Sequence, residues 1–444
     1  MTCAQTMRTA RWGCLALFFL STNRVMLGAE DGPVTRDQFL QLQQQNQLMQ
    51  QQLEKQQQLI DSLMLRVSQI QEARPASAQG MAAANVEEAP SPEPSFHLGK
   101  VDISGEGGLA FFDSQTAGQT PNAEFRVDEA RVFLEAPVWD EVYFYTELNL
   151  ATREQNDLGL RFGELYLDWE NVSRLWDRDR MLNLRVGRFY IPFGEEYQDR
   201  FAIDNPLISH SVSDLWGEDN GVQLYGAVDG VSYNLAVQSG GSPPSRDFTG
   251  DKSVAGRLGC DPAAWLHLSV SGMRTGELDA QNDVLSAIWF GNGFFRSLGS
   301  ASTTRFKANL VEGDAQANLS FLQLKAAGGY INYSDNDPLG SNHRDVYYYY
   351  VEGKHDFNRQ FYGAARLSEV FAHNGFPIVG NGVMGTYLFD ELTAQYWRLS
   401  LGAGYAFSKN LLVKAEYSLN RGRELDGTPR DEEDLFALET AFAF

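Results

Sequence analysis

The last ten residues of the chain, LFALETAFAF (Leu435–Phe444), alternate strictly between two kinds of side chain. The apolar and aromatic set consists of Phe436, Leu438, Thr440, Phe442 and Phe444. The opposite set holds mostly small residues, together with Glu439. A period of two residues places successive side chains on opposite faces of a β-strand. This stretch therefore predicts a terminal strand with one apolar face.

The same alternation recurs along the chain from Phe96 onward. It is clearest in WRLSLGAGYAF (Trp397–Phe407), LLVKAEYSLN (Leu411–Asn420) and VSYNLAVQ (Val231–Gln238). We count about sixteen such segments, each roughly 9 to 16 residues long. The joins between them alternate in length, and most short joins carry Asp, Gly, Asn or Ser, which tight turns prefer. The short joins are Trp139–Glu141, Asn171–Met181, Asp229–Gly230, Asp261–Trp265, Asp314–Ala317, Asp356–Gln360 and Ser408–Asn410. The long joins include Gly194–Asp219, Gly276–Ser302 and Ala372–Ala394.

Tight turns at one end of the strands and long loops at the other are typical of outer-membrane barrels. The sequence thus predicts an all-β fold, a 16-stranded antiparallel transmembrane β-barrel over residues 96–444. Sixteen strands enclose a water-filled lumen, whereas about eight strands are filled by side chains. The terminal aromatic residue, Phe444, resembles the signal by which bacterial outer-membrane barrels reach their insertion machinery. We therefore expect the protein in the bacterial outer membrane, in contact with its lipid.

Three segments precede the predicted barrel. Residues 1–29 have a positive start and a short apolar core, WGCLALFFL (Trp12–Leu20), which predict a secretory signal peptide. Residues 34–71 form a predicted periplasmic α-helical coiled coil, because apolar residues step by three and four in heptads with only Asn46 and Gln56 as polar seam positions. Such a stripe indicates self-association, as two or three strands. Residues 72–95 are rich in Pro, Ala and Glu and predict a flexible linker.

Two motifs carry a resemblance to a known family. RVGRFYIPFGEE (Arg185–Glu196) and GEDNGVQLYGAVDG (Gly217–Gly230) resemble segments of the phosphate-selective porin O and P family. The resemblance covers most of residues 96–444. It implies a sixteen-strand homotrimeric porin, often selective for phosphate or other anions. Several members also carry a Gln-rich coiled segment like Phe39–Ile70.

Strand alternation places a set of cations on the inner, polar face of the predicted barrel. These predicted pore-lining residues are Arg126, Arg131, Arg185, Arg257, Arg305, Lys307, Lys325, Arg366, Arg398 and Lys414. Rings of cationic side chains favour anions inside a pore with low-dielectric walls. We therefore expect passive diffusion of small hydrophilic solutes, with a preference for anions such as phosphate. The alternative is that these cations pair with acids on neighbouring strands and only stiffen the wall.

The long join after the fifth strand, Glu195–Glu218, is the third external loop. The resemblance implies that this loop folds into the lumen and narrows it. Its predicted constriction residues are Arg200, Asp204, His210 and Asp214. Arg200 is the only Arg or Lys between Glu195 and Glu218, and six acids oppose it. The loop thus departs from the cation-rich constriction of the family.

Other classes of protein find little support. A formal net charge of −22 disfavours nucleic-acid binding, which needs a basic face. The six His and three Cys are scattered, so we expect no metal and no cofactor. No nucleophile motif surrounds His210 and its neighbouring serines, and we expect no enzyme activity. The main rival is a non-conducting structural or adhesive barrel with a coiled-coil tether, and a secreted β-sandwich enzyme is a distant third. Peptidoglycan is an expected partner of the polar rod.

Overall fold

A computed structural model describes residues 96–98, 100–153, 160–242, 246–299, 302–340, 342–379 and 392–444. The chain divides into two units, Met1–Ala89 and Pro90–Phe444. The predicted signal peptide (1–29), coiled coil (34–71) and linker (72–95) lie outside the described residues. Among the described residues, no helix is long and apolar enough to cross a membrane.

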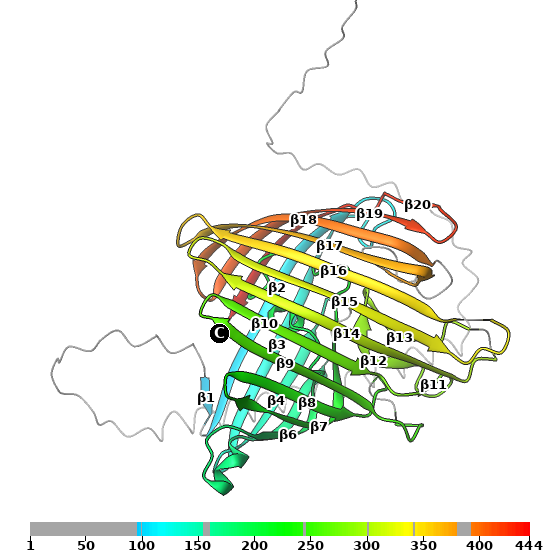
Figure 1. The fold of residues 1–444 in the computed structure, drawn as a ribbon. Helices are drawn as coiled ribbons and strands as arrows, with labels where there is room; N and C mark the ends of the chain where they lie inside the picture. Colours follow the sequence, from blue (N-terminus) through cyan, green and yellow to red (C-terminus); the bar gives the residue numbers. More distant parts are fainter. Residues whose placement is uncertain are drawn as a thin grey trace, which may run out of the picture. The chain divides into compact units, whose positions relative to one another are not determined.

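Antiparallel strands form one closed sheet in the second unit (Figure 1). Sixteen of the described strands build the wall, and the pairing of the first with the last closes it. In chain order they are β2 (Val101–Ser114), β3 (Glu124–Trp139), β4 (Val142–Ala151), β5 (Arg161–Trp169), β6 (Asn183–Tyr190), β7 (Trp216–Val228), β8 (Val231–Gln238), β9 (Ser253–Ala263), β10 (Leu266–Arg274), β14 (Arg305–Asn318), β15 (Gln323–Asp335), β16 (Arg344–Asp356), β17 (Phe361–Phe376), β18 (Thr393–Ser408), β19 (Leu411–Glu424) and β21 (Leu435–Ala443). The predicted 16-stranded barrel is confirmed.

The remaining described elements are not among the sixteen strands of the wall. They are β1 (Phe96–Leu98), β11 (Leu278–Asp279), β12 (Leu285–Phe290), β13 (Gly293–Arg296), β20 (Pro429–Arg430) and two short 3-10 helices, η1 (Val172–Trp176) and η2 (Glu196–Asp199). β1 forms a small hairpin with the start of β2. β12 pairs with β13 and also with the start of β7, where Trp289 lies opposite Trp216.

Closure depends on close backbone approach between β2 and the end of the chain. Phe444 donates its N–H to the Gly105 oxygen at 2.8 Å, and Gly105 donates back to Phe444 at 2.9 Å. A Cβ atom on Gly105 would lie 2.5 Å from the Phe444 ring and 2.8 Å from the Arg131 carbonyl oxygen. Glycine is therefore required where the first strand meets the last.

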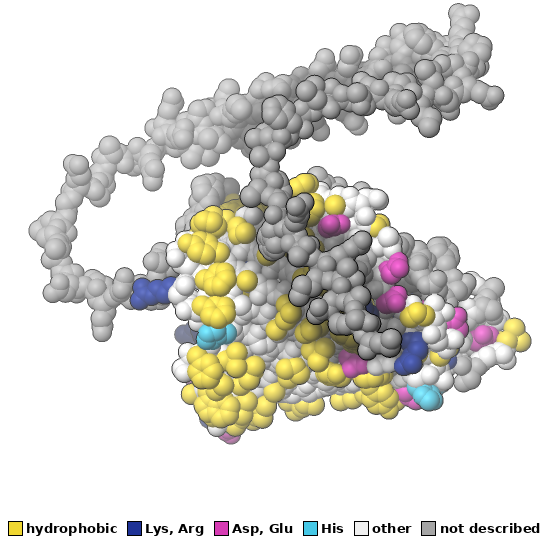
Figure 2. All heavy atoms as spheres, turned by 90° about the horizontal axis from the view of Figure 1, so that it is seen from above, with side chains coloured by type: hydrophobic (Ala, Val, Ile, Leu, Met, Phe, Trp, Pro, Cys, Tyr) yellow, Lys and Arg dark blue, Asp and Glu magenta, His cyan; other side chains and the backbone are white. Residues whose placement is uncertain are grey.

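Side chains divide between the two faces of the wall as alternation predicts. Hydrophobic side chains such as Leu401, Val413 and Leu235 point outward and are exposed, and Figure 2 shows yellow side chains gathered over the wall. Ser400, Ser418 and Asn420 point inward and are fully buried. Inward polar side chains can be this deeply buried only if other residues cover them inside the barrel. Loops that fold into the barrel provide these residues.

One expected turn is misplaced. The join predicted at Asp314–Ala317 lies within β14, which continues to Asn318, and the turn comes at residues 319–322.

The first half of β14 also differs from the prediction, because Phe306, Ala308 and Leu310 are buried inside the barrel. The prediction placed these apolar residues on the outer face.

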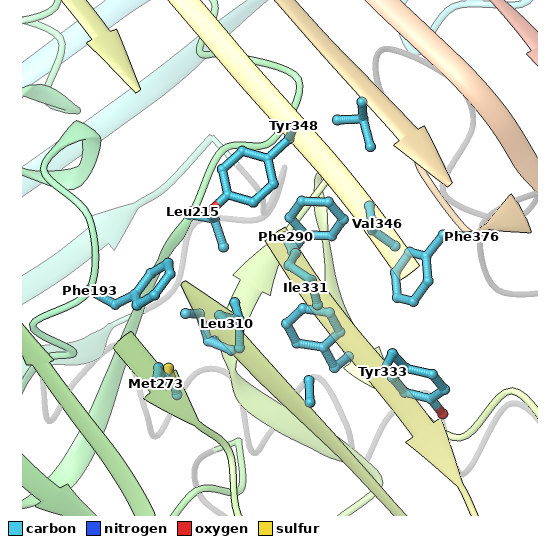
Figure 3. Close-up of a cluster of buried hydrophobic side chains, with 14 of the residues drawn as sticks. Phe193, Leu215, Met273, Phe290, Leu310, Ile331, Tyr333, Val346, Tyr348 and Phe376 are labelled. Atoms are coloured by element: carbon cyan, nitrogen blue, oxygen red, sulfur yellow. The ribbon is translucent and has the colours of Figure 1, made fainter. Parts of the chain in front are cut away.

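An apolar cluster inside the barrel explains that inversion. Phe290 of β12, Phe295 of β13 and Phe376 at the end of β17 pack on inward side chains of β14–β18, and Figure 3 shows this cluster. Phe290 lies 5.8 Å from Phe376 and 5.8 Å from Tyr348, measured between ring centroids. Each fully buried large apolar side chain stabilises the fold by about 1.5–3 kcal/mol. The loops thereby fill part of the lumen on this side.

Backbone hydrogen bonds join three of these loops. Gly291 donates its N–H to the Ser213 oxygen at 2.7 Å, and its own oxygen accepts from Val379 at 3.0 Å. Arg430 then donates to the oxygens of Ile378 at 2.7 Å and Val379 at 3.0 Å. Loops that follow β6, β10, β17 and β19 are therefore connected to one another.

Substitution of Gly105 by Ala tests the closure. We expect a loss of about 1–3 kcal/mol, because the added Cβ overpacks the seam against a backbone oxygen. Urea unfolding of the detergent-solubilised protein measures the loss. Gly272→Ala is the matched control, since a Cβ on Gly272 meets nothing within 4 Å. Equal unfolding midpoints for the two variants would contradict the assignment.

Candidate functional site

The loop between β6 and β7, residues 191–215, crosses the barrel interior, and we call it the constriction loop. It begins where Gly194 takes a positive φ of 68°, a conformation that glycine adopts without strain. The Gly194 N–H donates to the Ser271 hydroxyl of β10 at 3.0 Å, and its oxygen accepts from Arg257 of β9. The Pro-Phe-Gly motif thus turns the chain away from the wall and into the lumen.

Lys414 holds the tip of the constriction loop against the opposite wall. Its ammonium donates to the backbone oxygens of Ala202 at 2.7 Å, Leu207 at 2.9 Å and Asn205 at 3.2 Å. It also forms an ion pair with Glu439 at 2.6 Å, and only 1% of Lys414 is exposed. The ammonium of this predicted pore-lining cation is therefore fully occupied by three loop carbonyls and one wall carboxylate.

Arg366 and Arg398 make the same kind of contact. Arg366 of β17 donates to the Ser209 oxygen at 2.7 Å and pairs with Glu352. Arg398 of β18 donates to the His210 oxygen at 2.9 Å. Because both guanidinium groups bind loop carbonyls, they fix the loop as well as carrying charge into the lumen.

Carboxylates of the wall accept hydrogen bonds from backbone N–H groups of the constriction loop. Glu416 of β19 accepts from the Ser209 N–H at 2.8 Å and from the Ile208 N–H. On the same side of the wall, Glu129 of β3 accepts from the Ala202 N–H at 3.0 Å, while Lys414 binds the oxygen of that residue. Buried backbone groups need such partners, and an irregular loop has no sheet to supply them.

An ion pair closes the base of the constriction loop. Arg200 donates to both carboxylate oxygens of Asp214 at 3.0 Å, and the His210 ring lies 3.4 Å from the same carboxylate. Burial acts to raise the pKa of Asp214, but the charge of Arg200 and the hydrogen bonds to the carboxylate outweigh it and lower the pKa below its usual range. Asp214 adopts an unusual φ of 39°. Asp204, in contrast, is exposed at the loop's turn.

The other predicted pore-lining cations that face inward are also ion-paired. Arg131 lies 3.4 Å from Glu147, Arg185 lies 2.7 Å from Asp168, and Lys325 lies 2.6 Å from Asp199. Arg126 lies 3.4 Å from Asp128, and Arg257 lies 3.9 Å from Glu195. The pairing across neighbouring strands that the sequence left as an alternative therefore occurs at Arg131 and Arg185, whereas Lys325 and Arg257 pair with acids of the constriction loop.

Arg305 and Lys307 do not line the lumen, and the prediction for them was wrong. They share the outer face of β14 with Val311, while Phe306 and Ala308 point inward. Arg305 is 55% exposed and pairs with Glu277 of the neighbouring loop. Alternation along a strand shows only which residues share a face, not which face points inward. In β14 the apolar face points inward because it packs on the apolar cluster inside the barrel.

Arg153 is a lumenal cation that the sequence analysis missed. It follows β4 and pairs with the buried carboxylate of Asp128, donating from Nε at 2.6 Å. It also donates to the Ile208 oxygen of the constriction loop. Continuing the alternation of Glu147, Asn149 and Ala151 by one step would have placed Arg153 on the inner face.

Two cavities lie beside the constriction loop. The first, of about 90 Å³, we call the arginine cavity, because Arg126, Arg153 and Arg398 line it together with His210 and Asp214. The second, of about 10 Å³, we call the lower cavity, and it is lined by Glu196, Asp199, Arg200, Pro206, His210, Lys325, Tyr350, Glu352 and Arg366. His210 lines both. Among the described residues, no group of three or more His, Cys, Asp or Glu side chains could hold a metal ion.

Comparisons with known proteins agree with this architecture. No protein-family model and no curated protein sequence matches the chain. The outer membrane channel DcaP of Acinetobacter baumannii is similar with a TM-score of 0.52 and 11% identity, over 78% of this chain and 97% of that chain. In-vitro folded OmpT, an outer membrane protein of Vibrio cholerae, gives 0.52 and 13% over 78% and 97%. The anion-selective porin from Comamonas acidovorans gives 0.50 and 11% over 78% and 99%. The chain therefore has the fold of outer-membrane porins.

Replacement of Lys414 by Met tests how the constriction loop is held. The change leaves three loop carbonyls and Glu439 buried without their cation, so we expect a loss of about 3–5 kcal/mol in unfolding free energy. Urea unfolding and protease cleavage within residues 191–215 measure it. Adding Glu439→Gln to the same chain should recover part of the loss. Lys307→Met, on the outer face, is the control and should change neither measurement.

Proposed function

We propose that the protein is an outer-membrane porin that lets small hydrophilic solutes diffuse passively through its barrel. The observation that carries this proposal is the constriction loop, which is anchored to β10 through Gly194 and to β19 through Ala202, and which borders a cavity lined by Arg126, Arg153 and Arg398. An apolar outer wall suits lipid, and the closed sheet leaves no unpaired edge. The similar solved structures are titled outer membrane channels, proteins and porins.

The proposal extends to a modest preference for anions such as phosphate. Three guanidinium groups and the His210 ring meet at the arginine cavity, and preorganised Arg donors suit oxyanions. The pairing of Arg126 and Arg153 with Asp128 offsets part of that charge. A weak preference follows, because a fully paired wall attracts neither sign of ion strongly.

The assembly around the barrel belongs to the same proposal. The heptads of residues 34–71 support a homotrimer with a periplasmic rod, and OmpT of Vibrio cholerae is described in a trimer form. The rod's polar exterior and the linker at 72–95 support contact with peptidoglycan. Recovery of the protein with purified peptidoglycan sacculi tests this contact.

A non-conducting barrel is the second candidate. The apolar cluster and the constriction loop occupy part of the lumen, which favours a structural or adhesive role. The two candidates differ in one measurement. A porin gives stepwise conductance in a planar bilayer, and a plugged barrel gives none.

Reversal potentials in asymmetric potassium chloride test the anion preference. We expect wild-type channels to pass chloride over potassium, and Arg126→Gln to lower that permeability ratio about twofold, because one positive charge beside the cavity is removed. Added phosphate should reduce the chloride current in the wild type more than in the variant. Arg274→Gln, on the outer face of β10, is the matched control. An unchanged ratio in Arg126→Gln would contradict the anion preference while leaving the porin assignment intact.

A further inference from the structure

His210 occupies a distinctive position, because it lines both the arginine cavity and the lower cavity. Only 6% of the residue is exposed. Its backbone oxygen is held by Arg398 at 2.9 Å, so the residue is fixed in place while its ring remains at the boundary between the two spaces. A change of charge on this ring would alter the electrostatic potential in both cavities.

The ring contacts suit a neutral imidazole. Nδ1 lies 3.2 Å from Nη2 of Arg200, which can only donate, and Nε2 lies 3.1 Å from the Arg200 backbone oxygen, which can only accept. One nitrogen that accepts and one that donates is the hydrogen-bonding pattern of the uncharged ring with its proton on Nε2.

Acid groups for the protonated ring are also in place. The Asp214 carboxylate lies 3.4 Å from Nδ1, and Glu129 of β3 interacts electrostatically with the ring. Cations face it as well, since Arg153 lies 3.5 Å from Nε2 and Arg126 lines the same cavity. A protonated Nδ1 can no longer accept from Arg200, and its new N–H can donate to Asp214 instead.

We propose that His210 is a specificity-determining residue, and that its protonation increases the preference of the pore for anions. The inference rests on the proposed porin function. Taking up one proton adds a positive charge between the two cavities and turns the ring from Arg200 toward Asp214. The shared carboxylate then divides its hydrogen bonds between the ring and Arg200, so the net charge facing an anion becomes more positive.

Asp214 remains a carboxylate under the conditions that protonate an imidazole. Its pKa is lowered, so it loses its charge only as the pH falls below the ordinary range of a carboxyl group. The carboxylate that would accept a hydrogen bond from the protonated ring is therefore charged throughout the pH range of the test, about pH 8 to about pH 5.

The test compares reversal potentials of wild-type and His210→Gln channels in asymmetric potassium chloride at about pH 8 and about pH 5. In the wild type we expect the chloride-to-potassium permeability ratio to rise about threefold on acidification, because a unit charge is added close to the solute path. In His210→Gln, which keeps a donor and an acceptor but cannot take up a proton, we expect the rise to be lost or clearly smaller. Lumenal carboxylates titrate in both channels, so the difference between them is the measurement.

His343→Gln is the control, because His343 is 51% exposed in a loop outside the constriction. It should retain the full wild-type response to pH. Identical pH responses in wild type and His210→Gln would overturn the role of His210. Absence of any conductance would instead overturn the porin function, so the two failures are distinguishable.

Discussion

Every backbone amide of a sheet needs a partner, and the pairing of β2 with β21 supplies the last ones. Closure turns an open sheet into a cylinder with an inside and an outside, and alternation then assigns each side chain to one of them. Gly105 permits this seam because a larger residue would strike the Arg131 carbonyl. The apolar wall, the lumen and the crossing of the constriction loop all depend on that closed geometry.

Inside the barrel, many charged side chains of the wall bind the backbone of the constriction loop. Three wall cations donate hydrogen bonds to carbonyl oxygens of the constriction loop, namely Lys414, Arg366 and Arg398. Two wall carboxylates, Glu416 and Glu129, accept hydrogen bonds from N–H groups of the same loop. A loop without regular secondary structure can cross a barrel only if the wall satisfies its backbone. Beside this loop, Arg126, Arg153 and Arg398 line the arginine cavity together with His210.

The sequence predicts the wall well because a barrel strand has a simple period. The faces of Trp397–Phe407 and the place of the Gly194 turn agree with the structure. It fails at β14, where Phe306 and Leu310 alternate correctly but face inward against loop residues. Apolar residues that contact lipid and those that contact a folded-in loop look identical in a sequence. Which cations meet a carboxylate is equally hidden, since Arg131 and Glu147 become neighbours only through strand register.

The backbone links through Gly291 have a mechanical consequence. Ser213 of the constriction loop, Gly291 and Val379 are connected in series, and Arg430 continues the series to the loop before β21. Load applied to any of these segments is transmitted to the constriction loop rather than absorbed locally. The linked loops thus behave as one stiff framework, and displacement of one of them strains the others.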